Sequence, residues 1–178
     1  TSLFTMVNFE GSGMQDHELP TGLSKMLDFV TIKSNTHNAG WRSQFRKLCS
    51  PNQFLYLDSN VGIATDATVG MKWTYTDTSI LIDKYDQVNA LGYNYQMYGW
   101  ASSYKDEANT LIGNFEIGHY NSSVGTDTIL LNEDPGVLLI KRVDITGQDW
   151  VLIDKARLNG TVFTKLNINN IESSFGGS

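Results

Sequence analysis

The chain contains an internal repeat, and this feature limits its fold more than any other. Residues 29–33 (FVTIK) recur as 137–141 (VLLIK) at an offset of 108, and Trp41 recurs as Trp150 at an offset of 109. Two further blocks recur in the same order: 8–10 (NFE) as 114–116, and 54–60 (FLYLDSN) as 163–169 (FTKLNIN). Four blocks in one order, with offsets that drift by three residues, indicate two copies of one module within 178 residues. Superposing the copies should place Ile32 on Ile140 and Trp41 on Trp150, with 29–33 and 137–141 as equivalent central strands.

The two copies differ in completeness. Copy one covers residues 1–104 and copy two covers 105–178, so copy two has no counterpart of 73–76, 80–83 and 93–100. Such a sandwich keeps an open edge and an uncovered apolar face, exposing alternate residues of 136–143 and 150–153. We expect residues beyond Ser178 or a strand of another chain to cover them. The alternative is that copy one packs onto copy two as one merged sandwich.

Each repeated block is typical of a short β-strand. The blocks are rich in β-branched and aromatic residues, and turn signals with glycine lie between them, as at 38–40 and 144–147. Asn, Ser and Thr make up 46 of the 178 residues, which suits strands and turns better than solvated helices. We therefore predict an all-β protein: an antiparallel β-sandwich of the jelly-roll or lectin-like type, made of two repeated modules of which the second is incomplete.

Charge and cysteine content narrow the classes of function. With 13 Lys and Arg against 19 Asp and Glu, the net charge of −6 disfavours nucleic acid, which binds to basic surfaces. The single cysteine, Cys49, excludes an internal disulfide framework and any zinc site with several cysteines. No apolar run reaches the roughly 18 residues that cross a bilayer. Neither nucleic-acid binding nor membrane insertion is expected.

An ordered set of motifs gives a family resemblance. These are Asn-Phe-Glu-Gly-x-Gly at 8–13, Asp-Phe-Val-x-Ile-Lys at 28–33, Gly-Trp at 40–41, Leu-Tyr-Leu-x-x-Asn at 55–60, and the stretch from Val88 to Ala101. They resemble tandem β-sandwich modules of tailed-phage virion and tail-fibre proteins, for which a concanavalin-like lectin fold is inferred. The resemblance implies a location on the exterior of the phage particle. It also implies partners among copies of the chain and other virion proteins.

Aromatic residues gather in the part of copy one that copy two lacks. Sugars bind to aromatic faces, with amides and carboxylates on their hydroxyls, so this part is the candidate glycan site. Its candidate residues are Trp73, Tyr75, Asn94, Gln96, Tyr98 and Trp100. Strand alternation places Tyr93, Tyr95 and Met97 on one face of the strand. The other face carries Asn94, Gln96, Tyr98 and Trp100. If the site is real, at least two of its four rings are exposed and coplanar. The competing interpretation is that most of these rings fill the core.

No motif for catalysis or for a resident cofactor is present. His17, His37 and His119 have no partner at metal-ligand spacing. The oxygens of 58–60 and 144–149 fall short of the six to eight ligands of a calcium site. We therefore predict no catalytic residue, no metal and no cofactor. The expected function is a non-enzymatic tail-fibre or adhesion module that contacts host surface glycans. The alternative is a capsid-exterior decoration or head-fibre protein that serves assembly, and a glycan hydrolase with paired carboxylates ranks last.

Overall fold

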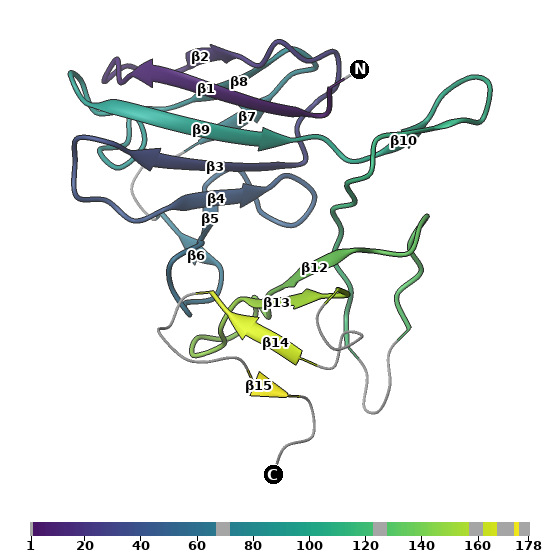
Figure 1. Ribbon diagram of the computed structural model, residues 1–178. Coiled ribbons are helices and arrows are strands. Elements are labelled where there is room, and N and C mark those ends of the chain that lie inside the picture. The colour runs from purple at the N-terminus through teal and green to yellow at the C-terminus, as the bar shows by residue number, and fades with distance from the viewer. Residues whose placement is uncertain (1, 67–71, 123–127, 157–161, 167–172, 175–178) are drawn as a thin grey trace. The chain divides into compact units, whose positions relative to one another are not determined.

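Every regular element among the residues that the structure describes is a strand. The computed structural model describes residues 2–66, 72–122, 128–156, 162–166 and 173–174 (Figure 1). Ten strand pairs among these residues are antiparallel, which confirms the predicted all-β antiparallel class. Residues 167–169 of the repeated block 163–169 lie outside the described residues. The described residues include no helix long and apolar enough to cross a membrane.

The chain forms two compact units. Unit 1 comprises Thr1–Leu55 and Ala64–Asn121, and unit 2 comprises Tyr56–Ile63 and Ser122–Ser178. This division differs from the boundary at 104/105 that the repeat predicts. The reason is that the segment after residue 104 packs on unit 1, where Ser103 N–H donates to the Phe115 carbonyl at 2.7 Å.

Unit 1 contains a six-stranded sheet of order β1-β9-β3-β4-β5-β6 (Figure 1). The strands are β1 (Phe4–Glu10), β3 (Phe29–Ser34), β4 (Arg42–Phe45), β5 (Gln53–Tyr56), β6 (Ala64–Thr65) and β9 (Asn94–Trp100). β9 lies between β1 and β3 and pairs with each along its whole length. Residues from the two ends of copy one thus pair with each other at one side of this sheet, where β1 is the edge strand.

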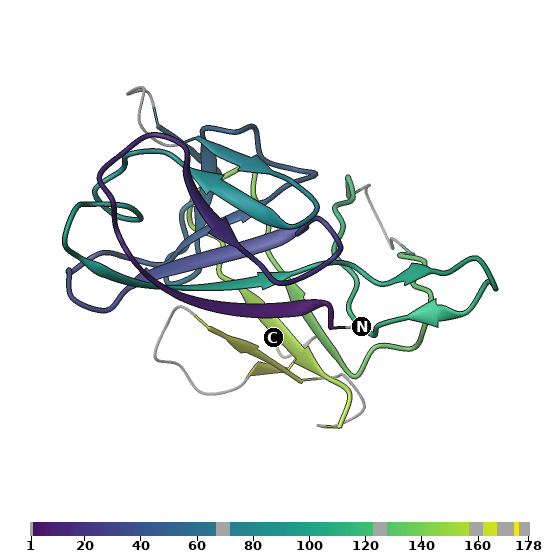
Figure 2. The ribbon, with the colours of Figure 1, turned by 90° about the horizontal axis from the view of Figure 1, so that it is seen from above.

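A second sheet of unit 1 has three strands in the order β2-β8-β7. These are β2 (His17–Pro20), β7 (Trp73–Tyr75) and β8 (Ser79–Ile82), and the views from two directions place them as a layer against β1, β9 and β3 (Figures 1 and 2). The core between the layers consists of fully buried apolar side chains from both sheets, among them Leu19, Val30, Ile32, Trp73, Ile80, Ile82 and Met97. This arrangement is a β-sandwich, as the alternating strands predict.

A short hairpin follows the sandwich. β10 (Tyr104–Lys105) pairs with β11 (Leu111–Ile112), and Asn109 at the turn has a positive φ of 60°. The loop after β11 returns to the end of β9, where Phe115 contacts Trp100. The segment 114–116 thus occupies no strand, although the repeat equates it with part of β1.

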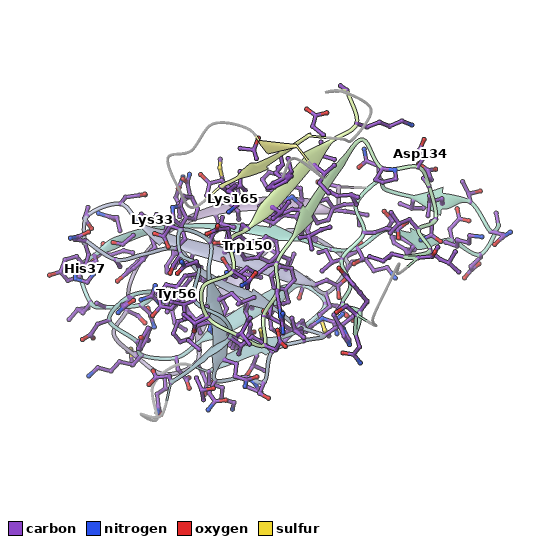
Figure 3. All side chains as sticks on the ribbon, turned by 90° about the horizontal axis from the view of Figure 1, so that it is seen from below. Lys33, His37, Tyr56, Asp134, Trp150 and Lys165 are labelled. Carbon is purple, nitrogen blue, oxygen red and sulfur yellow. The ribbon has the colours of Figure 1, made fainter. Side chains whose placement is uncertain are left out.

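Unit 2 contains a four-stranded sheet of order β12-β13-β14-β15. Its strands are β12 (Val137–Ile140), β13 (Val151–Asp154), β14 (Val162–Lys165) and β15 (Ser173–Ser174). Trp150 is 1% exposed and donates from Nε1 to the Tyr56 carbonyl at 2.8 Å, which ties the 56–63 loop to this sheet (Figure 3). Trp150 is therefore the anchor of the described part of the unit-2 core.

One expectation about unit 2 is wrong. β3 is a central strand, but β12 lies at the edge of its sheet among the described residues. The physical reason is that copy two lacks a counterpart of 93–100, as expected from the sequence. No described segment therefore lies beside β12 in the way that β9 lies beside β3. The exposure of Val137 (56%) and Leu139 (41%) agrees with the open edge expected from the sequence.

Candidate aromatic binding site

The outer face of β9 carries the polar and aromatic residues that the alternation predicts. Tyr95 and Met97 are fully buried, whereas Asn94 is exposed and Gln96, Tyr98 and Trp100 are half-buried. The rings of Tyr98 and Trp100 stack with centroids 6.4 Å apart and planes 20° apart. These two rings are near-parallel and reach the surface of the sheet, although neither is fully exposed.

Trp100 is the centre of an aromatic row that crosses the sheet. It faces Phe29 of β3 at 5.2 Å and Phe4 of β1 at 5.1 Å, and Phe29 in turn stacks on Phe45 of β4 at 4.4 Å. Each of these pairs is directly opposite in the strand register. Cross-strand aromatic pairs of this kind stabilise a sheet by about 0.2–1 kcal/mol each, so part of the row serves packing.

At the edge of the sheet the row opens into a cleft of about 250 Å³. We call it the aromatic cleft, and its lining residues are Ser2, Leu3, Phe4, Trp100, Gly113, Asn114 and Phe115. Phe4 is 43% exposed and Phe115 is 37% exposed, and the Phe115 ring lies 5.9 Å from Trp100 with planes 22° apart. The cleft therefore combines three aromatic residues with Asn114 and with Ser2, whose hydroxyl bonds the Phe4 backbone.

Gly113 has a specific role in this cleft. Its φ of +91° lies in the region that favours glycine, and a Cβ at this position would lie 2.2 Å from Cδ1 of Leu3. The lack of a side chain at residue 113 therefore favours both the backbone conformation of the turn that carries Asn114 and Phe115 and its close approach to Leu3.

Two of the six candidate residues do not belong to this surface. Trp73 on β7 is 2% exposed and faces the core of the sandwich. Tyr75 follows on the same face of β7, and its hydroxyl donates to Oε1 of the buried Gln44 at 2.7 Å. Burial raises the pKa of Tyr75 well above its usual value. Trp73 therefore packs in the core, as the competing interpretation has it, and the half-buried Tyr75 is held by its bond to Gln44.

The remaining polar candidates lie further along β9. Gln96 accepts a hydrogen bond from the Tyr98 hydroxyl, and its amide lies against Met6 Sδ at 3.4 Å. Asn94 is at the other end of the strand from Trp100, and its backbone N–H donates to Thr36. The structure thus brings Trp100 and Tyr98 together with Gln96 but leaves Asn94 apart from the cleft.

Asn89, in the motif stretch from Val88 to Ala101, has a structural role. Asn89 is 0% exposed, and its Oδ1 accepts hydrogen bonds from Ser12 N–H and His17 Nδ1, both at 2.8 Å. Its Nδ2 donates to the Met14 carbonyl at 2.9 Å. Asn89 therefore joins the loop after β1 to the loop before β9 and is not available to a ligand.

Ionic groups of the described residues form local pairs. Asp28 bonds to Arg46 and accepts the Ser102 N–H at 3.0 Å, and Asp144 pairs with Arg142 at 2.7 Å. Within the part of the chain that the structure describes, no three His, Cys, Asp or Glu side chains gather as metal ligands would.

The sequence did not reveal Phe4, Asn114 and Phe115 as cleft residues. The only signal was the match of 114–116 to 8–10, which predicted a strand position rather than a contact with Trp100. One family model, described as "Domain of unknown function (DUF7483)", matches residues 1–177. No curated protein and no solved structure matches the chain.

Proposed function

We propose that this chain, which belongs to the DUF7483 family, is a non-enzymatic module that binds glycans in the aromatic cleft. The observation that carries the proposal is the cleft itself, which is lined by Trp100, Phe4 and Phe115 together with Asn114. Aromatic rings recognise the apolar C–H faces of a sugar, and amides recognise its hydroxyls.

The size of the cleft limits the ligand. Its volume of about 250 Å³ lies below the roughly 300–1,000 Å³ of pockets that enclose drug-sized ligands. It suits one sugar ring, with the rest of the chain passing over the outer face beside Tyr98. Such a site binds the end or a branch of a surface glycan weakly, and several copies on one particle would raise the avidity.

The cleft favours binding over hydrolysis. Glycoside hydrolysis uses two carboxylates that flank the scissile bond, and the described residues lining the cleft include neither Asp nor Glu. The resemblance to tailed-phage modules supports a location of this binding on the exterior of a virion, and we propose a tail fibre as the carrier.

A second role has support from a different part of the molecule. The exposed apolar side chains of β12 in unit 2, Val137 and Leu139, favour contact with another protein. This observation supports the alternative of a capsid-exterior decoration or head-fibre protein, in which assembly is the main role. Both roles are compatible with one chain because they use different units.

The binding proposal is tested with bacterial surface polysaccharides and their fragments, screened on an array and followed by calorimetry. Phe115→Ala removes one wall of the cleft without touching the sandwich core, and we expect it to weaken binding at least tenfold. Tyr93→Ala is the matched control, because Tyr93 is similarly exposed (40%) but packs on His37 and does not line the cleft. An equal loss of affinity in the two variants would refute the proposal. So would the absence of binding to any polysaccharide at a millimolar concentration of sugar units.

A further inference from the structure

The hairpins β3–β4 and β12–β13 have the same pairing register. Val30 pairs with Gln44 and Ile32 with Arg42, while Leu138 pairs with Ile153 and Ile140 with Val151. These pairs correspond residue by residue at offsets of 108 for the first strand and 109 for the second.

A side-chain contact at the end of each hairpin agrees with this correspondence. Lys33 Nζ donates to the Ala39 carbonyl, and Lys141 Nζ donates to the Gln148 carbonyl. In both hairpins the accepting carbonyl lies two residues before the tryptophan, Trp41 or Trp150.

The two hairpins differ at the other edge of their first strand. β3 pairs there with β9, with Phe29 opposite Trp100 and Thr31 opposite Tyr98. Among the described residues, no strand pairs with the corresponding edge of β12. Because Lys155 N–H donates to the Gly136 carbonyl, the alternation of an antiparallel pair directs the backbone groups of Val137 and Leu139 away from β13.

The open edge is also apolar. Val137 and Leu139 are 56% and 41% exposed, although their counterparts Phe29 and Thr31 are 7% and 2% exposed. An unpaired, apolar edge strand is a template for pairing with another chain.

We propose that the edge of β12 pairs with the edge of β12 in a second copy of this chain, antiparallel and about a twofold axis at Leu138. The charges that flank the strand select this partner. Glu133 and Asp134 precede β12, and Lys141 and Arg142 follow it. A strand with an acidic start and a basic end is complementary to itself when it pairs antiparallel.

The register follows from two conditions. The outward residues Val137 and Leu139 must face outward residues of the partner, and opposite charges must face each other. A twofold axis at Leu138 places Val137 opposite Leu139 and Asp134 opposite Arg142, each pair occurring twice. If the twofold axis lay one residue further along, at Leu139, Asp134 would instead lie opposite Asp144 of the second copy, and these like charges would repel.

The present partners of these charges do not prevent the contact. Asp134 pairs with Lys155, and Arg142 pairs with Asp144, all on exposed side chains. Exposed ion pairs contribute little, so the side chains can exchange partners at low cost. The resulting twofold contact is closed, because each copy has used its one β12 edge.

The test uses charge reversal in the full chain, with the oligomeric state measured by sedimentation and native mass spectrometry. The unmodified chain should form a dimer at micromolar concentration. Asp134→Arg alone brings two basic side chains face to face at each contact, and Arg142→Asp alone brings two acidic side chains face to face, so each variant should dissociate at least tenfold more readily. An equimolar mixture of the two variants should form a heterodimer, because both contacts then regain opposite charges.

Two controls separate pairing from folding. Lys155→Ala removes the partner of Asp134 within its own chain but leaves the proposed contact intact, so this variant should remain dimeric. Leu139→Pro removes an outward N–H while the β12–β13 bonds of Leu138 and Ile140 remain, so it should be monomeric with unchanged unit-1 unfolding. An unmodified chain that is still monomeric at 100 μM would overturn the proposal, because this concentration is roughly tenfold above the dissociation constant of the weakest dimer that the charge test can resolve. A mixture of the two variants that forms no heterodimer would also overturn it.

Discussion

Asn89→Ala should destabilise unit 1 more than any other single change of a polar side chain in its loops. The Asn89 side chain is 0% exposed and joins the loop before β9 to the loop after β1 and the start of β2, because it bonds Ser12, His17 and the Met14 carbonyl at 2.8–2.9 Å. Alanine has no group that can replace either the acceptor or the donor.

The magnitude follows from the bonds lost. Each hydrogen bond contributes about 0.5–1.5 kcal/mol net, and a buried group left without a partner costs about 1–3 kcal/mol. Ser12 and His17 are half-buried and Met14 is exposed, so water replaces part of the loss. We expect a decrease of about 3 kcal/mol in the free energy of unfolding, which lowers the melting temperature by roughly 6–12 °C.

Urea unfolding followed by circular dichroism and tryptophan fluorescence measures this change, with the slope checked for constancy. Asn94→Ala is the control of the same residue type, since Asn94 is exposed and its replacement should change the free energy by less than about 0.5 kcal/mol. If Asn89→Ala also stays within 0.5 kcal/mol of the unmodified chain, the loops are held by their backbone contacts and the reasoning fails.

Two further predictions concern an ion pair and a core ring. Burial alone would raise the pKa of Asp28, but the Ser102 N–H and the cations of Arg46 and Lys47 outweigh it, so the net pKa is lowered. The unfolding free energy should therefore fall as pH drops below about 4 and through the folded-state pKa. Asp28→Asn should flatten this decline, which urea titrations at several pH values measure. If the variant leaves the slope of unfolding free energy against pH unchanged, the decline does not come from Asp28. Trp150→Ala should destabilise unit 2 by about 3–5 kcal/mol. Trp41→Ala, in the matched position of unit 1, should cost less because Trp41 is half-buried. Hydrogen exchange of β13 and β4 measures the two effects, and an equal loss of protection in both strands would refute this ranking.

Periodicity predicted the parts of the fold that depend on one strand at a time. The alternation along β9 correctly put Tyr95 and Met97 on one face and Gln96, Tyr98 and Trp100 on the other, and the structure shows that the first face is the buried one. The same alternation put Trp73 and Tyr75 together on one face of β7 but could not say which face was the core. That decision depends on the sheet that packs against β7, which no local pattern encodes.

The candidate site was predictable only where it lies on β9. Phe4 reaches Trp100 through strand pairing across 96 residues of sequence, and Phe115 reaches it through the loop after β11. The repeat drew attention to 114–116 as a strand of copy two, yet this segment lies in unit 1. A repeat predicts local structure well, but it does not predict where a copy with missing strands attaches its remaining segments.

The contrast between the two hairpins connects folding with association. β3 has five of its six residues buried, whereas the described residues of β12 are all half-buried or exposed. The hydrophobic stabilisation that holds β3 in place is therefore small for β12, and among the described residues of unit 2 the core depends largely on Trp150 and the 56–63 loop. A unit this small gains little stability from a single core, so a partner that binds only its folded form stabilises it by mass action. For β12 the folding of unit 2 and the pairing of two copies are consequently linked equilibria, and weakening the edge contact weakens the unit that presents it.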